Sequence, residues 1–288
     1  MDLAMQVRAR SAAHEKHIRA ISKALNELAN VRTLWHFGCV NKGGPHRRLA
    51  GAPSPISIGE DECEVFGAVI ERFKPKHCFI VGNAFGFSAA YIALAMRDIG
   101  AEHVVALDAE TEGDGVELAT VARGLAKSLN VELLHIKKGL SPQDVPATVE
   151  TEKYDLIFID GNHNAPYVRN DLHGLLPYMH EQTVVVFHDF FLDGVRDGVE
   201  AALASGLQCL WLPTSCEMVV ATRSASRLAE LRQLFPKGTD VPRDRRKIAL
   251  GPEQGSYWFW LTRVLPVHYA VALERLLGKG PLRHSASR

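Results

Sequence analysis

The chain has 288 residues, of which 47% are hydrophobic and 23% are charged. This composition is typical of a folded globular protein and argues against disordered and repetitive architectures. Its 33 Lys and Arg residues balance its 33 Asp and Glu residues, so no bulk charge is present to hold a nucleic-acid backbone or an anionic membrane surface. The balance favours a small, discrete ligand and predicts neither a nucleic-acid partner nor a membrane partner.

Cysteine usage and the first residues of the chain bear on its compartment. The five Cys residues include no C-x-x-C pair, which predicts buried free thiols in a reducing compartment. Residues 1–30 lack an apolar signal core and contain Glu15 and Glu27, which argues against a secretory signal and a transit peptide. No apolar run approaches the length of a bilayer span. We therefore expect a cytoplasmic protein.

Three segments precede the regular part of the chain. Apolar residues recur at three- and four-residue steps through residues 5–29, which predicts an amphipathic helix that needs a partner surface. Residues 40–57 concentrate Gly, Pro and basic residues and are typical of a loop or linker. An apolar stripe from Val65 to Phe73 predicts a second helix that ends before Pro75.

From His77 onward, short apolar runs alternate with helical patterns. The predicted strands are 77–81, 103–107, 131–136, 154–159, 183–187, 207–212 and 216–222, with helices predicted at 88–98, 115–129, 142–150, 164–179 and 193–205. Alternating strands and helices predict parallel βαβ units. The last two strands are only three residues apart, so they are predicted to form an antiparallel hairpin at one edge. The fold class is therefore α/β: a doubly wound, Rossmann-like, seven-stranded sheet of five parallel strands plus this hairpin.

A glycine loop follows the first predicted strand. Residues Gly82 to Ser88 read GNAFGFS and lead into a helix. Glycine permits a tight turn and a close approach by a ligand, and the amino end of a helix offers free N–H groups. The segment is neither a dinucleotide G-x-G-x-x-G loop nor a Walker loop, because no Lys follows. A plain turn is the alternative interpretation.

Polar residues also follow the second and third predicted strands. Asp108 ends the second strand, where an acid can accept both ribose hydroxyls of a nucleoside; a helix-capping Asp is the alternative. Glu110 and Glu112 lie nearby and compete for the ribose assignment. After the third strand, Gly139 to Ser141 can flank an adenine or form a turn that caps the next helix.

Titratable residues cluster after the fourth and fifth predicted strands. Asp160, Gly161 and His163 follow the fourth, and His188 and Asp189 follow the fifth. Ligands of open α/β sheets bind beyond the carboxyl ends of the strands. Packing does not require such a constellation there, although Asn and Asp also initiate ordinary turns.

The segments VGNAFGFSAAYIA, VVALDAE, YDLIFIDGNH and VVVFHDF, in this order and spacing, resemble class I S-adenosylmethionine-dependent methyltransferases. The branch that contains the catechol-type and macrocin-type O-methyltransferases is the most similar, because its glycine motif is likewise G-x-x-x-G-x-S. The resemblance covers roughly residues 55–222 and implies S-adenosylmethionine as the cofactor.

The resemblance also implies roles for individual residues. It places cofactor contacts at Gly82, Asn83, Ala84, Phe85, Gly86, Ser88, Asp108, Ala109, Gly139, Leu140, Ser141, Asp160 and Gly161. Within this set, the glycine loop would surround the methionine end, Asp108 would hold the ribose, and Leu140 with Ser141 would border the adenine. The chain departs from the family at Ile80, where an acid usually stands two residues before the first glycine. How the cofactor's amino group is held is therefore an open question.

The catalytic residues implied by the resemblance are Asp160, His163 and His188. Asp160 would lie beside the sulfonium and the substrate. His163 stands where the catechol-type enzymes carry a catalytic Lys, so it would abstract the acceptor's proton; a helix cap or a stack on adenine is the alternative, and His188 is the reserve base.

The catechol-type enzymes also bind a divalent metal with acids after the fourth strand and an Asp-Asn pair after the fifth. This chain offers Asp160, His188 and Asp189 at those places. An oxygen-rich site suits magnesium or calcium, whereas an imidazole shifts the preference toward transition metals. A metal-free enzyme in which His188 forms a polar wall is the alternative.

These features divide the chain into an N-terminal helix with a lid or linker (1–54), an S-adenosylmethionine-binding methyltransferase domain (55–222) and a C-terminal helical extension (223–288). The helix at 5–29 and the loop at 39–48 are lid candidates. The aromatic cluster at 257–260, before a helix predicted at 262–277, suits a core or subunit interface better than a substrate cage. In similar enzymes such added helices build a dimer, so a homodimer is an expectation here.

We therefore predict methyl transfer from S-adenosylmethionine to a hydroxyl of a small molecule, such as a sugar or phenolic natural product. Another enzyme of the same fold, such as an aminopropyltransferase or an NAD-dependent oxidoreductase, is an alternative, although the dinucleotide fingerprint is missing. A non-catalytic cofactor-binding module is a third, suggested by Ile80.

Overall fold

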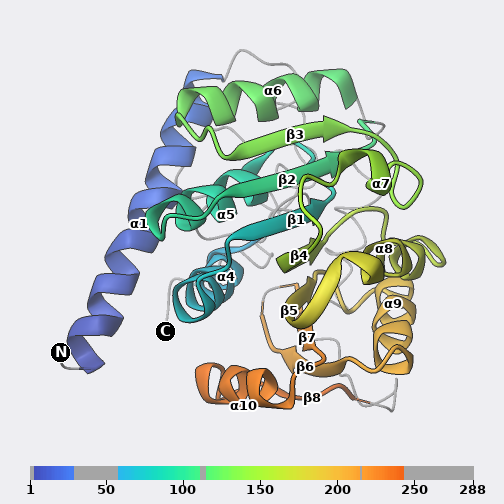
Figure 1. Cartoon of the computed structure of the whole chain (residues 1–288). Coiled ribbons are helices and arrows are strands. Elements are labelled where there is room, and N and C mark those ends of the chain that lie inside the picture. The colour runs from blue at the N-terminus through green and yellow to red at the C-terminus, as the bar shows by residue number, and fades with distance from the viewer. Residues whose placement is uncertain (1–2, 29–57, 111–114, 215, 243–288) are drawn as a thin grey trace, which may run out of the picture.

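The computed structural model describes residues 3–28, 58–110, 115–214 and 216–242 (Figure 1). At its centre is an eight-stranded sheet in the order β3-β2-β1-β4-β5-β7-β6-β8. The strands are β1 His77–Val81, β2 His103–Asp108, β3 Leu134–Lys138, β4 Tyr154–Ile159, β5 Met179–Phe187, β6 Gln208–Leu212, β7 Met218–Thr222 and β8 Thr239–Asp240. The first five strands run parallel, whereas β7, β6 and β8 pair antiparallel with their neighbours.

The predicted α/β fold class is confirmed, with three corrections to the strands. One is that β5 begins at Met179, four residues before the predicted start at residue 183. The sheet has eight strands instead of seven, because Thr239 and Asp240 pair with β6; two residues are too few to show a period in the sequence. The third strand begins at Leu134 rather than at Val131. The preceding helix ends at Ser128, and Asn130, two residues later, has a left-handed φ of 51°. The chain then needs the next three residues to turn back toward β2.

The described helices are α1 Leu3–Glu27, α4 Glu60–Phe73, α5 Phe87–Asp98, α6 Gly115–Ser128, α7 Val145–Thr148, α8 Tyr167–Leu175, α9 Asp193–Ala204 and α10 Ala225–Leu234. The helix predicted over 164–179 is shorter than expected, since it starts only after Pro166 and gives way at Leu176 to a 3₁₀ turn. The helix predicted at 142–150 is the single turn α7. Helix α4 begins at Glu60, five residues before the apolar stripe that predicted it.

The helices cover both faces of the sheet because strand residues alternate between two hydrophobic cores. Along β1, Cys78 and Ile80 pack into the core shared with α1, α4, α5 and α6. Phe79 and Val81, which point the other way, pack into the core shared with α8 and α9. Because side chains along the strands are buried in these two cores, polar side chains that could bind a ligand are expected at the strand ends.

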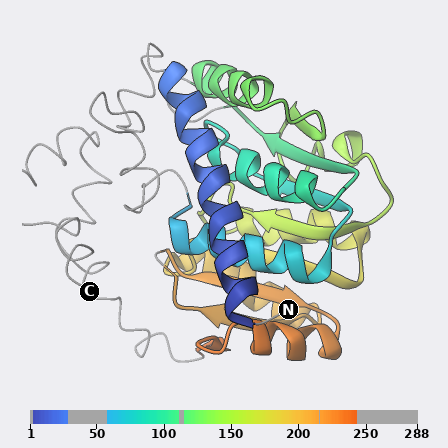
Figure 2. The ribbon, with the colours of Figure 1, turned by 90° about the vertical axis from the view of Figure 1, so that its left-hand side faces the viewer.

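Helix α1 crosses the outer side of the helical layer (Figure 2) and packs against α4, α5 and α6. Its predicted need for a partner surface is therefore confirmed. Ile21 and Leu25 are fully buried there, and His14 Nδ1 lies 2.6 Å from the hydroxyl oxygen of Tyr91 on α5. None of the described helices is long and apolar enough to cross a membrane.

Several predictions concern residues outside the described ranges. These are the linker at 40–57 and the loop at 39–48, Glu112, the aromatic cluster at 257–260 and the helix at 262–277.

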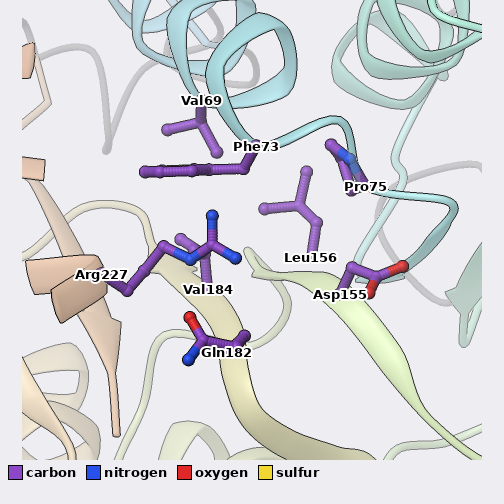
Figure 3. Close-up of a pocket in the computed structure, with 8 residues that line it drawn as sticks. All are labelled: Val69, Phe73, Pro75, Asp155, Leu156, Gln182, Val184 and Arg227. Atoms are coloured by element: carbon purple, nitrogen blue, oxygen red, sulfur yellow. The ribbon is translucent and has the colours of Figure 1, made fainter. Parts of the chain in front are cut away.

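Figure 3 shows the side chains around the start of β4, at the amino edge of the parallel strands, where residues of α4, β5 and α10 come together. A cavity of about 30 Å³ lies there, with space for about one water molecule. The Arg227 guanidinium lies 4.1 Å from the centre of the Phe73 ring. Asp155, near the start of β4, accepts hydrogen bonds from the backbone N–H groups of Lys76 (2.9 Å) and His77 (3.0 Å). The cavity is too small for a substrate, and its polar groups hold β1 against β4.

We predict that Asp155→Ala lowers the free energy of unfolding by about 1–2 kcal/mol, because two backbone N–H groups lose their acceptor. Urea denaturation of purified protein measures the change. Glu152→Ala is the control, since this exposed acid lies three residues away and should alter stability by less than about 0.5 kcal/mol. Equal effects of the two substitutions would contradict this role for Asp155.

Candidate functional site

The predicted site lies where the sheet order reverses between β1 and β4. The backbone ladder continues one residue past β4 and past β5: Asp160 N–H donates to the Val81 carbonyl (2.9 Å), and His188 N–H donates to the Ile159 carbonyl (3.3 Å). A β-carbon on Gly82, where φ is 87°, would lie 2.1 Å from the Asp160 carbonyl oxygen. Only glycine fits this turn, so the glycine loop lies directly against the residue that follows β4.

Asp108 holds the glycine loop in place. Its Oδ2 accepts hydrogen bonds from the backbone N–H groups of Asn83 (2.6 Å) and Ala84 (3.0 Å). Its Oδ1 accepts one from the N–H of Glu110 (2.6 Å). The sequence predicted a ligand role for Asp108, with a helix-capping Asp as the alternative. The structure adds a structural role: the Asp108 carboxylate, at the end of β2, holds the first residues of the glycine loop that follows the neighbouring strand β1.

The other acid described at this turn is already paired. The Glu110 carboxylate forms ion pairs with Arg123 and Lys138. Asp108 therefore lies nearer to the glycine loop and is the better placed of the two for a ligand there. Ala109, between them, is partly exposed.

Inside the glycine loop, Asn83 is 5% exposed, and its side-chain oxygen has no hydrogen-bond partner among the described residues. A buried polar atom without a partner costs free energy, so it marks a place where a ligand can donate. The Phe85 and Ile80 side chains are instead buried in the hydrophobic core. At these two positions the side chain packs in the core and does not face a ligand on the loop.

The turn after β3 lies beside the same strand ends. Gly139 N–H donates to the Asp108 carbonyl (2.9 Å), and Leu140 N–H donates to Asp144 Oδ2 (2.7 Å). The Leu140 side chain is 56% exposed, which is unusual for a large apolar residue. This exposed apolar side chain, one residue after the Gly139 that bonds to Asp108, is suited to contact a flat ring.

Four titratable side chains converge after β4 and β5. Asp160 Oδ1 lies 3.2 Å from His163 Nε2 and 3.1 Å from His188 Nδ1. Asp189 Oδ2 lies 3.5 Å from His163 Nε2 and 3.4 Å from His188 Nδ1. Two carboxylates and two imidazoles that are separate in the sequence thus form one cluster, which we call the strand-end cluster.

The turn that carries Asp189 has an unusual backbone. Asp189 has a φ of 59°, a left-handed conformation that is costly for most residues and is tolerated best by Asn, Asp and Gly. The next residue, Phe190, is anchored by its N–H to the Glu217 carbonyl (2.9 Å). The conformation directs the Asp189 carboxylate toward the two histidines.

Glu62 of α4 lies behind the cluster and is fully buried. Its Oε2 accepts from Gly59 N–H (2.8 Å) and lies 2.9 Å from His188 Nε2. Its Oε1 accepts from the Thr214 hydroxyl (3.0 Å) and from Cys216 N–H (2.9 Å). One carboxylate thus joins the start of α4, the end of β5 and the turn before β7.

The charges in the cluster support one another. Burial alone would raise the pKa of the Asp160 carboxyl, but His188 and His163 beside it hold that pKa below its usual range. Burial alone would lower the pKa of His188, yet the three neighbouring carboxylates raise it well above its usual range. The pKa of His163 is raised for the same reason, mainly by Asp160. Burial opposes ionisation of Glu62 as well, but His188 lowers its pKa.

The donor set also fits a divalent metal. The ligand atoms of Asp160, His163 and Asp189 lie within 4.8 Å of one another, and His188 Nδ1 faces both carboxylates. Ligand atoms that share one ion at about 2.0–2.2 Å lie roughly 3 Å apart. Glu62, His188 and Cys216 form a second such group. Glu62 cannot serve there without losing backbone hydrogen bonds, because each of its oxygens already has two neighbours.

Sequence reasoning named Asp160, His163, His188 and Asp189, and the structure brings them together. It missed Glu62 and Thr214. The spacing from Gly59 to Glu62 is that of a capping box, which could have placed the start of α4. No sequence signal joins Glu62 to His188, which lies 126 residues away.

Comparisons with known proteins identify the part of the chain that carries this site. Residues 80–190, from β1 to the turn after β5, match the family described as "Methyltransferase domain". No curated protein sequence matches the chain.

Three solved structures share the fold. The O-methyltransferase from Bacillus cereus in complex with SAH has a TM-score of 0.52 and 16% identity, covering 71% of this chain and 90% of that chain. The O-methyltransferase TomG from Streptomyces achromogenes, involved in tomaymycin synthesis and solved with SAM, has a TM-score of 0.52 and 16% identity, covering 70% and 88%. An SAH-bound methyltransferase from Podospora anserina has a TM-score of 0.51 and 14% identity, covering 77% and 96%.

One further acid lies beneath the site. Asp171 of α8 is 3% exposed, and its Oδ2 lies 3.5 Å from where a β-carbon on Gly161 would stand. Burial raises the pKa of this carboxyl to about 6. In the unfolded chain the group ionises near pH 4, so folding resists its ionisation at neutral pH.

We predict that Asp171→Asn stabilises the protein at pH 8 by about 2–3 kcal/mol, because the variant has no charge to bury. The folded-state pKa is raised, so the penalty in the wild type is absent below about pH 4, develops between pH 4 and 6, and is complete above pH 6. Unfolding free energies measured from pH 4 to 8 give the difference between the two proteins.

The exposed Asp193→Asn is the control. Its difference from the wild type should stay within about 1 kcal/mol and show no step between pH 4 and 6. A flat difference for Asp171→Asn would rule out a buried charge at this position.

Proposed function

We propose that this chain, whose residues 80–190 match the family described as "Methyltransferase domain", transfers a methyl group from S-adenosylmethionine to a hydroxyl oxygen of a small molecule. The proposal rests on the position of the glycine loop relative to the strand-end cluster. The glycine loop held by Asp108 lies against Asp160, and the strand-end cluster begins at Asp160. A cofactor bound on the loop would therefore place its reactive end beside two imidazoles and two carboxylates.

The residues present suit the cofactor. Asp108 retains lone pairs beyond its three backbone bonds and can accept from the ribose hydroxyls. The buried side-chain oxygen of Asn83 can accept from the cofactor's amino group, which would replace the acid missing at Ile80. Leu140 can cover the adenine. When bound, the cofactor supplies the methyl group: the acceptor's oxygen–carbon bond forms as the carbon–sulfur bond breaks, and the electron pair of that bond stays on sulfur.

His163 is the proposed base. Its side chain is 31% exposed, whereas that of His188 is 4% exposed, so only His163 is readily reached by an acceptor. Asp160 and Asp189 both face its Nε2, which places the ring proton there and leaves the Nδ1 lone pair to take the hydroxyl proton. This arrangement positions a base beside the point of attack.

A divalent metal is part of the proposal. Asp160, His188 and Asp189 would hold it, with open positions for the acceptor's oxygen atoms. It would lower the pKa of a coordinated hydroxyl and so favour its deprotonation. The acceptor class follows from the same chemistry, since sugars and phenols offer hydroxyls to such a site.

We predict that S-adenosylmethionine and S-adenosylhomocysteine raise the melting temperature and that NAD does not, because a ligand of the native state stabilises it by mass action. Asp108→Asn should weaken S-adenosylhomocysteine binding at least tenfold by calorimetry, since an amide cannot accept on both sides. Glu152→Gln is the control and should bind normally. NAD binding without any response to S-adenosylhomocysteine would refute the proposed function.

We also predict that His163→Ala lowers turnover by on the order of a hundredfold while S-adenosylhomocysteine affinity changes less than about threefold. Turnover is measured as release of S-adenosylhomocysteine during incubation with panels of phenols and sugars, and mass spectrometry identifies the methylated product. His173→Ala, an exposed histidine on α8, is the matched control. Near-normal turnover in His163→Ala would show that another group accepts the proton.

A further inference from the structure

Glu62 has a hydrogen-bond pattern that fixes its chemistry. Gly59 N–H and Cys216 N–H can only donate. The Thr214 hydroxyl accepts from Met218 N–H (3.0 Å), so its own proton is directed to Glu62. With all of these neighbours donating, Glu62 is an acceptor throughout, as a fully buried carboxylate must be to remain charged.

The consequence for His188 follows from its ring. The contact between His188 Nε2 and Glu62 Oε2 (2.9 Å) can form only if Nε2 carries a proton. The other nitrogen, Nδ1, lies 3.1 Å from Asp160 Oδ1 and 3.4 Å from Asp189 Oδ2. Glu62 therefore keeps the proton on Nε2 and fixes the orientation of the ring. The proton on Nδ1, which faces the two carboxylates, is the one that a metal ion would displace.

We propose that Glu62 is the positioning residue of a divalent transition-metal site formed by Asp160, His188 and Asp189. A histidine that binds a metal with one nitrogen commonly donates its other N–H to a carboxylate, which fixes the ring and makes the ligand more basic. Glu62 and His188 have this arrangement, and α4, an element remote in the sequence, supplies the carboxylate. The imidazole shifts the preference of the set from Mg²⁺ toward ions such as Zn²⁺ and Ni²⁺.

The metal site itself does not depend on the proposed function. Only the reaction in which the ion would take part rests on that function. Metal binding is measured without turnover, and S-adenosylhomocysteine binding is measured separately. If the cofactor does not bind but the metal does, the proposed function fails and the metal site stands. The reverse result leaves the methyltransferase proposal intact and overturns the role of Glu62.

The variant test uses Zn²⁺ alone as the probe, in competition with a chromophoric chelator. We expect Glu62→Gln to weaken Zn²⁺ binding by 10- to 100-fold, the usual effect of losing such a carboxylate. Glu64→Gln makes the same chemical change two residues away on the exposed side of α4, and its Zn²⁺ affinity should equal that of the wild type. Circular dichroism establishes that each variant is folded.

A second measurement needs no variant, so it decides the matter even if Glu62→Gln fails to fold. In full-length wild-type protein with ¹⁵N-labelled histidine, addition of Zn²⁺ should move His188 Nδ1 to a metal-bound shift while Nε2 stays protonated. A purely structural ion pair between Glu62 and His188 would show no such change. The proposal is overturned if the wild type binds no Zn²⁺, if Zn²⁺ leaves the His188 resonances unchanged, or if folded Glu62→Gln binds Zn²⁺ as tightly as the wild type.

Discussion

The arrangement of the site depends on the close approach of two backbones at the centre of the sheet. Strands β1 and β4 are paired up to Val81 and Ile159, and the chain then turns at Gly82 directly against the Asp160 carbonyl. Any side chain at Gly82 would force the two strand ends apart. Because this contact is preserved, the loop that leads into α5 and the cluster that begins at Asp160 share one edge of the sheet, and a cofactor and an acceptor can meet there.

The two edges of the sheet use carboxylates for different purposes. At the amino edge, Asp155 accepts from two backbone N–H groups beside a cavity of about 30 Å³, and its role is to hold strands together. At the carboxyl edge, Asp160 and Asp189 face imidazoles whose protonation is set by the surrounding charges. Asp108 has both kinds of role, since it fixes the loop and retains lone pairs for a ligand.

Glu62 and the groups around it illustrate why a buried charge is accompanied by several donors. Glu62 is fully buried, and a lone carboxylate there would be expensive to ionise. Two backbone N–H groups, a hydroxyl and an imidazole surround it, so the charge is supported by donors from three parts of the chain. The same contacts leave His188 with little freedom to rotate, and a fixed imidazole is what a metal ligand requires.

The sequence by itself determined the order and type of the elements, because hydrophobic periods of two and of three to four residues are local properties. It also determined that Asp108, Asp160 and His188 stand at strand ends, since each directly follows an apolar run. Asp189 comes one residue after His188, and His163 comes three residues after Asp160. The family resemblance supplied the cofactor. What only the tertiary structure decided are the contacts between distant segments: the three backbone bonds that occupy Asp108, the eighth strand, and the pairing of Glu62 with His188 across 126 residues. The physical reason is that a hydrophobic period specifies which face of an element is buried, whereas the partner of a buried carboxylate is fixed only when the packed layers bring particular donors within 3 Å.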